Sequence, residues 1–175
     1  MRALIVIDMQ NDFVQQGGAL YFTGAERVIA PVIDLVKNAI DNSDAIITTQ
    51  DWHDIDDVEF TLWPRHCVKN TIGAQIVEPL KTHLAGYEKY FAVHKNRYSA
   101  FYGTNLDELL RKLSVKQVDV CGVVTHICVL FTVEELRNRG IDVRVHEKAT
   151  ASYDSDLHRF AIRMMKEILG AEVVP

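Results

Sequence analysis

The sequence predicts a three-layer α/β/α fold with a mostly parallel central sheet, on the strength of two observations. Short apolar runs rich in branched residues alternate along the whole chain with segments of helical periodicity. This alternation is typical of right-handed βαβ crossovers, which place parallel strands side by side and helices on both faces. No repeat or linker interrupts it, and 175 residues suit one domain and are too few for two. We therefore expect a single domain over residues 1–175.

The strands are predicted from continuous apolar runs, the pattern of strands that are buried on both faces. Ala3–Ile7 is the first run, and Asp8 ends it. Ala45–Thr49 is the second, and it is ended by Gln50 and Asp51. The remaining runs span residues 89–93, 117–121, 142–146 and 172–174.

The helices are predicted from apolar residues that recur every three or four positions. Residues 25–39 show this spacing, although Pro31 predicts a late start or a bend. Further helices are predicted over 105–113, 130–139 and 156–169. Residues 51–71 show no periodicity, and an irregular stretch of this length inside a compact domain is usually functional.

Composition argues against several classes of partner. The net charge of −5 is unfavourable for a nucleic acid or an anionic membrane surface as the main partner. No apolar run approaches the roughly 20 residues of a membrane span, and the first run is too short for a signal peptide. The three cysteines include no CxxC pair, which is typical of reduced thiols. We expect a cytoplasmic protein.

Cys128 stands between a predicted strand and a predicted helix. The first turn of a helix has free N–H groups and the positive end of the macrodipole, so a thiol there ionises more easily. Asp8 and Lys95 also follow strand ends, where ligands bind in open α/β sheets. A carboxylate can take the proton of a thiol and a lysine can offset their repulsion, so the three residues predict covalent catalysis. The alternative is a buried apolar cysteine, a helix-capping aspartate and a solvated lysine.

A second cluster lies in the irregular stretch and contains Asp51, His53, Glu59 and His66. Asp51 and His53 are two residues apart, so an extended segment places both side chains on one side. Mixed carboxylate and imidazole ligands suit Zn²⁺, Mn²⁺ or Fe²⁺. The alternative is an acidic loop without a metal, and the neighbouring Cys67 is either a ligand or a core residue. Three loop aromatics either pack or form flat walls for a planar ring: Phe13, Trp63 and Tyr98.

Four motifs, in order along most of the chain, resemble those of the isochorismatase-like cysteine hydrolases, and within them the nicotinamidase and pyrazinamidase branch. The motifs are Ile7–Phe13, Asp51–His53 with Trp63–Val68, Lys95–Phe101 and Gly122–Val129. Each motif alone would be a weak signal, but the ordered set is highly specific. One position departs from the family pattern, because residue 126 is often acidic there and is His126 here.

The resemblance implies a metal-containing amidohydrolase that converts nicotinamide to nicotinate and ammonia through a thioester. It implies a catalytic triad of Asp8, Lys95 and Cys128. It also implies a cis peptide between Val123 and Val124, which turns the N–H of Val124, with that of Cys128, toward the oxyanion. The chemistry expected is nucleophilic attack by Cys128 with Asp8 as base and then acid.

The resemblance further implies a metal site, with zinc favoured over manganese or iron. Asp51, His53 and His66 are its expected ligands, and Glu59 falls on a fourth position that varies within the family. A pyridine ring would lie between Phe13 and Trp63, with its nitrogen toward the metal or a metal-bound water. Tyr98 and Val123 are also expected at the substrate.

Two other functions are kept as alternatives. One is an amidase of the same fold that acts on a carbamoyl or ureido compound, since such relatives keep the triad and lack the metal cluster. The other is a non-catalytic protein that binds small molecules on this fold. Family members often form oligomers, so the sequence leaves open whether this chain forms a homo-oligomer.

Overall fold

The computed structural model describes all 175 residues and contains one six-stranded sheet. The strand order is β3-β2-β1-β4-β5-β6, and every neighbouring pair is parallel. The α/β class predicted from the sequence is therefore confirmed. The strands are β1 (Arg2–Ile7), β2 (Ala45–Asp51), β3 (Tyr90–Lys95), β4 (Gln117–Val123), β5 (Asp142–Ala151) and β6 (Glu172–Val174).

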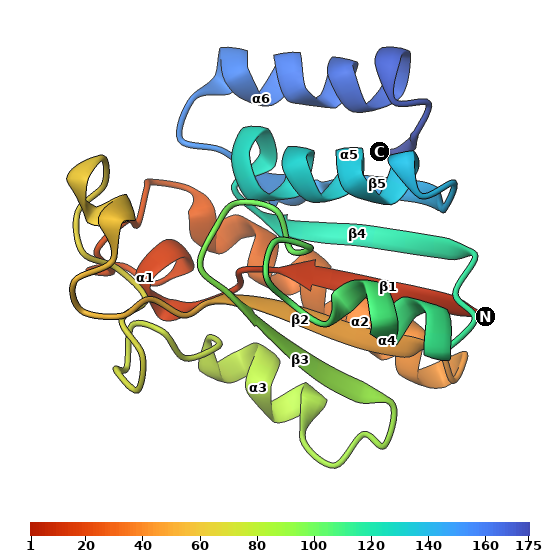
Figure 1. The fold of residues 1–175 in the computed structure, drawn as a ribbon, viewed down its shortest axis with the longest axis horizontal. Coiled ribbons are helices and arrows are strands. Elements are labelled where there is room, and N and C mark those ends of the chain that lie inside the picture. Colours follow the sequence, from red (N-terminus) through yellow and green to blue (C-terminus); the bar gives the residue numbers. More distant parts are fainter.

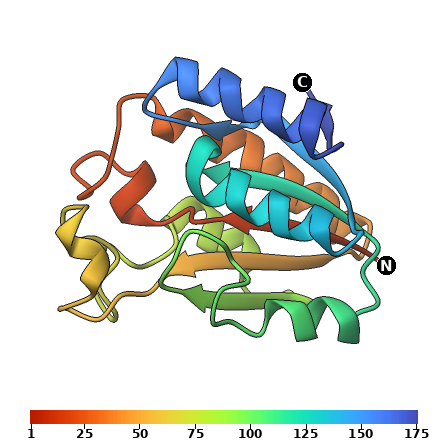
Figure 2. The same cartoon turned by 45° about the horizontal axis from the view of Figure 1, so that its top comes forward.

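Helices cover both faces of the sheet, as Figures 1 and 2 show. Side chains alternate across each strand, so Leu4 and Val6 pack into one apolar core while Ile5 and Ile7 pack into the other. Burying each such side chain contributes about 1.5–3 kcal/mol. The first core includes residues of α1 (Asn11–Val14), α2 (Ile29–Asp41) and α3 (Glu78–Leu84). The second includes residues of α4 (Leu106–Lys112), α5 (Leu130–Asn138) and α6 (Ser155–Arg163).

Two helical regions differ from a simple α-helix. Residues Ala25–Val28 form a 3₁₀ turn (η1), so α2 starts late and Pro31 falls in its first turn, where a missing N–H costs nothing. The π-helical turn η3 (Thr125–Val129) separates β4 from α5, and a second one, η4 (Met164–Ile168), follows α6. Apolar spacing does not distinguish a π turn from an α turn, so neither of these two π-helical turns is predicted from the sequence.

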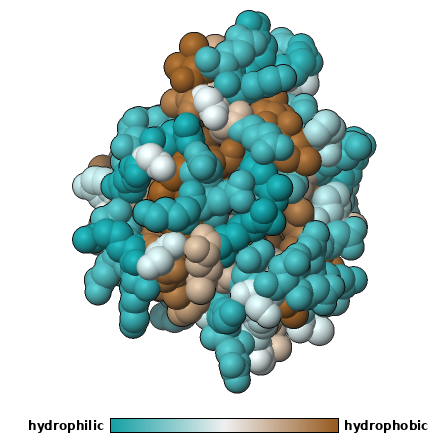
Figure 3. Space-filling model, turned by 90° about the vertical axis from the view of Figure 1, so that its right-hand side faces the viewer, coloured by the Kyte–Doolittle hydropathy of each residue, from teal (hydrophilic) through white to brown (hydrophobic).

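The two ends of the sheet differ in character. The amino ends of the strands form a mainly hydrophilic face with scattered apolar side chains (Figure 3). At the other end, β1, β2, β3 and β4 bring their carboxyl ends together, since they are adjacent and parallel. The candidate site lies there. None of the helices has the length and apolar character that crossing a bilayer requires.

Candidate active site

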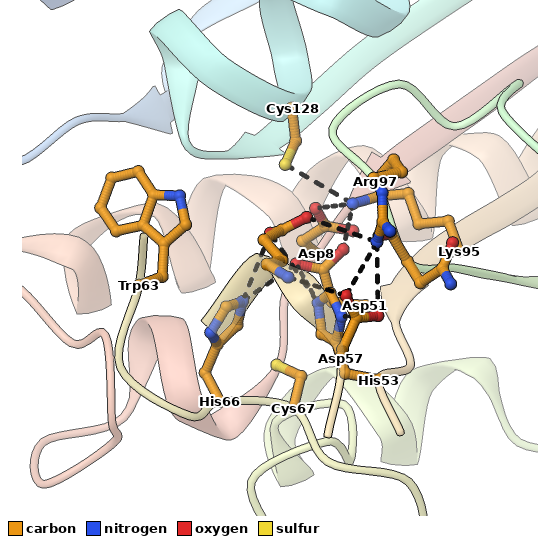
Figure 4. A network of polar contacts seen from close by, with 12 residues as sticks. Asp8, Asp51, His53, Asp57, Trp63, His66, Cys67, Lys95, Arg97 and Cys128 are labelled. Carbon is orange, nitrogen blue, oxygen red and sulfur yellow. Dashed lines mark hydrogen bonds and ion pairs between the residues drawn. The ribbon is translucent and has the colours of Figure 1, made fainter. Parts of the chain in front are cut away.

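The three predicted catalytic side chains meet at the carboxyl end of the sheet (Figure 4). Lys95 Nζ lies 2.8 Å from Asp8 Oδ2 and 3.5 Å from Cys128 Sγ. The same ammonium group forms an ion pair with Asp51. All four residues are buried. The structure thus brings Asp8, Lys95 and Cys128 within contact of one another.

Asp8 is aimed by an unusual backbone conformation. Its φ of 51° lies in the left-handed region, which costs about 1–2 kcal/mol for most residues and which aspartate tolerates better than most. Its N–H donates to Thr49 O at 3.1 Å, and its Oδ1 accepts from Thr49 Oγ1 at 2.7 Å. These two bonds leave Oδ2 facing Lys95. Thr49 is therefore a supporting residue that sequence reasoning missed.

The chain reaches Cys128 through Gly122 and the turn η3. Gly122 has a φ of 112°, and a Cβ there would lie 2.0 Å from Ile7 O, so only glycine lets β4 approach β1 this closely. The peptide between Val123 and Val124 is cis, as the family resemblance predicts. Cys128 then lies within η3, the turn that runs directly into α5.

Burial and the neighbouring charges shift the pKa values of all three groups. Burial raises the pKa of the Cys128 thiol well above its ordinary value, although Lys95 acts in the opposite direction. The expectation that the helix start makes this thiol ionise easily is therefore wrong, because desolvation of the thiolate outweighs the nearby positive charge. Burial also raises the pKa of Asp8, which makes its carboxylate a stronger proton acceptor. Burial disfavours charged Lys95, but Asp51 and Asp8 raise its pKa well above the ordinary value.

The predicted metal ligands converge beside this triad. Asp51 Oδ2 lies 3.7 Å from His53 Nε2 and 3.6 Å from His66 Nε2. The three ligand atoms all lie within 4.8 Å of one another. Glu59 Oε1 is 4.0 Å from each imidazole nitrogen, so it stands slightly farther out than the other three. The sequence predicted these four residues, and the structure places them together.

One buried atom in this set points to a cation. His53 Nε2 has no hydrogen-bond partner, and the imidazole is fully buried. Buried polar atoms without a partner are rare and call for an explanation such as an ion. Nitrogen and carboxylate donors in this number suit zinc and similar divalent metals. The residues present therefore fit a divalent metal site.

Gln10 and Asp12 fix the segments that carry the ligands. Gln10 Nε2 donates to Asp51 O and its Oε1 accepts from Asp51 N, both at 2.8 Å, so one buried amide holds both backbone groups of the ligand. Asp12 Oδ2 accepts from Cys67 N at 2.7 Å, next to His66. Cys67 itself is fully buried in an apolar core, so it is a core residue. Both supporting residues stand in the first motif, but only the fold shows what they hold.

A pocket opens over Cys128 and three members of the ligand set, Asp51, Glu59 and His66. Phe13, Trp63 and Tyr98 line it, as the sequence predicts, and Trp63 Nε1 donates to Tyr98 Oη at 3.0 Å. Val124 lines it too, but Val123 does not: it is fully buried in the core shared with α2, because its side chain points to that face. The placement of Val123 at the substrate is therefore corrected. The pocket has three further lining residues that the sequence did not reveal: Leu20, Ile127 and Tyr153.

Comparison with known proteins agrees with this geometry. The isochorismatase domain family matches residues 2–174. A nicotinamidase/pyrazinamidase of Mycobacterium tuberculosis is 33% identical over 178 residues, which cover 95% of each chain. The crystal structure of a nicotinamidase/pyrazinamidase from Bacillus subtilis has a TM-score of 0.94 and 32% identity, with 99% of both chains covered. That of a pyrazinamidase from Pyrococcus horikoshii in complex with zinc has a TM-score of 0.90 and 33% identity, over 99% of this chain and 98% of the other. The chain belongs to the isochorismatase domain family.

Proposed function

We propose that this protein is an amidohydrolase that converts nicotinamide to nicotinate and ammonia. The observation that carries the proposal is the pocket, in which flat aromatic walls stand over both a buried thiol and an imidazole–carboxylate set. A planar ring with a carboxamide would present its carbonyl carbon to Cys128 and its ring to Phe13 and Trp63. The activity named for the Mycobacterium tuberculosis and Bacillus subtilis relatives supports this choice of substrate.

In the first half of the reaction, Cys128 Sγ attacks the carboxamide carbon and its proton passes to Asp8. Lys95 lies against both groups and stabilises the negative charge that they share during the transfer. The N–H groups of Val124 and Cys128 would hold the oxyanion. Asp8 then returns the proton to the nitrogen, the C–N bond breaks and ammonia leaves. The acyl group remains on Cys128 as a thioester.

In the second half, water attacks the thioester carbon while Asp8 takes one of its protons. The C–S bond breaks, nicotinate is released, and the proton held by Asp8 returns to the Cys128 sulfur. Each cycle therefore consumes one amide and one water and restores every side chain. Asp8 acts as base in both attacks and as acid in both departures, which suits a carboxyl group whose pKa burial has raised.

The proposal includes zinc as the metal, with manganese and iron as alternatives. Asp51, His53, His66 and Glu59 would hold it, and when bound it supplies a Lewis-acidic centre on the pocket wall. Asp51 contacts Lys95 as well as the imidazoles, so one carboxylate joins the two halves of the site.

We also propose a reducing, cytoplasmic compartment, because all three cysteines are free and buried.

The deciding experiment measures ammonia release from nicotinamide by metal-loaded protein and by the same protein stripped with a chelator. Turnover is expected to fall on stripping and to return with Zn²⁺, Mn²⁺ or Fe²⁺. A folded protein with a reactive Cys128 that releases no ammonia under any condition would move the substrate to the carbamoyl or ureido class. A Cys128 that also fails to react with an aldehyde substrate analogue would favour a non-catalytic binding protein.

A further inference from the structure

We propose that Asp57 and Arg97 are positioning residues that orient His53 and Glu59 within the ligand set, an inference that rests on the metal site of the proposed function. Neither residue belongs to the triad or to the ligands. Both lie directly beside the set in Figure 4. Arg97 stands in the same motif as Lys95, two residues after it.

Asp57 fixes the ring of His53. Its Oδ2 lies 3.0 Å from His53 Nδ1, on the side of the ring opposite the ligand set. A carboxylate acceptor there favours the tautomer with the proton on Nδ1, which leaves the Nε2 lone pair free for a metal. The Asp57 side chain is only 6% exposed, so little water competes for this bond.

The second oxygen of Asp57 fixes Glu59. Asp57 Oδ1 accepts from the N–H of Glu59 at 2.9 Å. This bond caps the 3₁₀ turn η2 (Val58–Thr61), which carries Glu59. One carboxylate therefore orients the ring of one ligand and the backbone of another.

Arg97 holds this carboxylate in place. Its Nη1 lies 3.0 and 3.3 Å from the two oxygens of Asp57, and 3.8 Å from Glu59 Oε2. Because Arg97 pairs with Oε2, the other oxygen of Glu59 is left facing the two imidazole nitrogens. Arg97 follows Lys95 by two residues, so it also ties the loop after β3 to the loop that carries the ligands.

The other imidazole does not depend on a side chain. His66 Nδ1 lies 2.8 Å from the backbone oxygen of Pro64, which gives it the same orientation without a carboxylate. His53 is thus the ligand whose orientation a substitution can test. Removing the outer partner of a metal-binding histidine typically weakens metal affinity by about 10- to 100-fold.

The test measures the zinc affinity of metal-stripped protein by competition with a chromogenic chelator. Asp57→Ser keeps an oxygen that can cap η2 but is too short to serve His53 and Arg97 as well, and we expect affinity to fall by about 10- to 100-fold. Arg97→Met keeps the apolar stem and removes the charge, with an expected loss of about 3- to 10-fold. Asp56→Ser is the matched control, because it removes an exposed charge from the same loop. Its affinity is expected to stay within about twofold of the wild type, since solvent screens an exposed charge.

A second readout separates positioning from a merely structural role. Nitrogen-15 NMR of the metal-free protein, recorded at a pH at which the His53 ring is neutral, is expected to show the proton on Nδ1 in the wild type and a mixture of tautomers in Asp57→Ser. Asp57→Asn still offers an oxygen to Nδ1, so it is expected to restore the tautomer. Its NH2 group cannot accept from the N–H of Glu59 or pair with Arg97, so only part of the affinity is expected to return.

The inference is wrong if Asp57→Ser binds zinc as tightly as Asp56→Ser, or if the His53 tautomer does not change. Should Asp57→Ser fail to fold, Arg97→Met decides, because that side chain is 35% exposed and its loss leaves no core cavity. If the variants show these differences in zinc affinity but the wild-type protein releases no ammonia, the proposed function is overturned and the inference stands.

Discussion

At the scale of single residues, Lys95 is the group on which the site depends most. Its ammonium lies between Asp8 and Asp51 and contacts Cys128, and all four residues are buried. A buried ion pair adds little net stability over a well-packed apolar pair, but removing one partner leaves an uncompensated charge. We therefore expect Lys95 to be needed for the fold of the site as well as for the chemistry proposed above.

Lys95→Met is expected to abolish ammonia release and to lower the free energy of unfolding by about 3–5 kcal/mol, because two buried carboxylates lose their cation. Urea denaturation and the ammonia assay measure the two effects. Lys81→Met is the control, since Lys81 forms only an exposed pair with Glu78 and its loss is expected to cost about 0.5 kcal/mol or less. Unchanged stability in Lys95→Met would contradict the role given to this charge.

Cys128→Ala is expected to abolish turnover and leave the fold intact, because it removes only the sulfur. Cys121→Ala is a close control, as Cys121 is equally buried and lies within β4. Ammonia release and circular dichroism of both variants provide the measurement. Appreciable turnover by Cys128→Ala would rule out the thioester mechanism.

Asp119 gives the protein a stability contribution that depends on pH. Burial opposes its ionisation, but hydrogen bonds with His146 (2.6 Å) and Arg144 (2.9 Å) hold the pKa of Asp119 below its ordinary value. A lowered pKa in the folded protein means that this stabilisation is present above about pH 4, the pKa in the unfolded chain, and is lost as the pH falls through the folded pKa.

Asp119→Asn is therefore expected to lower the free energy of unfolding by about 1–2 kcal/mol at pH 7, where the carboxylate is charged. The difference from wild type should shrink progressively below about pH 4. Urea unfolding of both proteins at several pH values from about 2 to about 7 measures this difference in the free energy of unfolding. Asp142→Asn removes a carboxylate that is 78% exposed and should show little effect at any pH. A constant difference for Asp119→Asn across the range would refute the linkage.

At the scale of elements, the sequence predicts every strand and the exact bounds of β6, but several other strands are longer than their apolar runs. β2 continues two residues past the predicted end, because polar Gln50 and Asp51 still pair with β3. β5 extends five residues beyond its apolar run, and its register with β4 shifts between Val120 and Gly122. Apolar patterns report burial, so a strand that carries polar residues toward a site appears shorter than it is.

A substitution at Gly122 tests whether β4 must approach β1 this closely. Gly122→Ala is expected to lower the free energy of unfolding by about 3 kcal/mol or more, because the new Cβ would overlap Ile7 O. Gly140→Ala shares the positive φ but has open space around it, so it should cost only about 1 kcal/mol. Equal losses in the two variants, measured by urea unfolding, would show that backbone strain alone sets the cost.

The site divides in the same way between predictable and unpredictable parts. Asp8, Asp51 and Lys95 could be identified, because they lie at or just past strand ends, which converge in any parallel sheet. Leu20 and Tyr153 could not, since they come from loops at opposite ends of the chain that only the folded structure brings to the pocket. The raised pKa of Cys128 was also missed, because helix position can be read from sequence and complete desolvation cannot.

At the scale of the whole molecule, metal binding should stabilise the fold, since the ligands are assembled only when β2 and the loop after it have docked. A metal present at about 100 times its Kd adds about 2.7 kcal/mol to the free energy of unfolding. For a chain of this length, that increase raises the Tm by about 5–10 °C. Thermal unfolding of stripped protein with and without Zn²⁺ measures this. His66→Ala should lose the gain, whereas His83→Ala, a substitution in α3 outside the ligand set, should keep it. A rise of the same size in both variants would place the metal elsewhere.

The strand order also has a consequence for synthesis on the ribosome. β1 occupies the middle of the sheet, and its second neighbour, β4, starts only at Gln117. Translation from Ile7 to Gln117 takes on the order of 5–20 s, and for that time one edge of the most apolar strand has no partner. Cys128 emerges after β4, so the nascent chain carries Asp8 and Lys95 well before it carries the proposed nucleophile. The chain is thus most vulnerable to aggregation in the same interval in which it has no amidase chemistry.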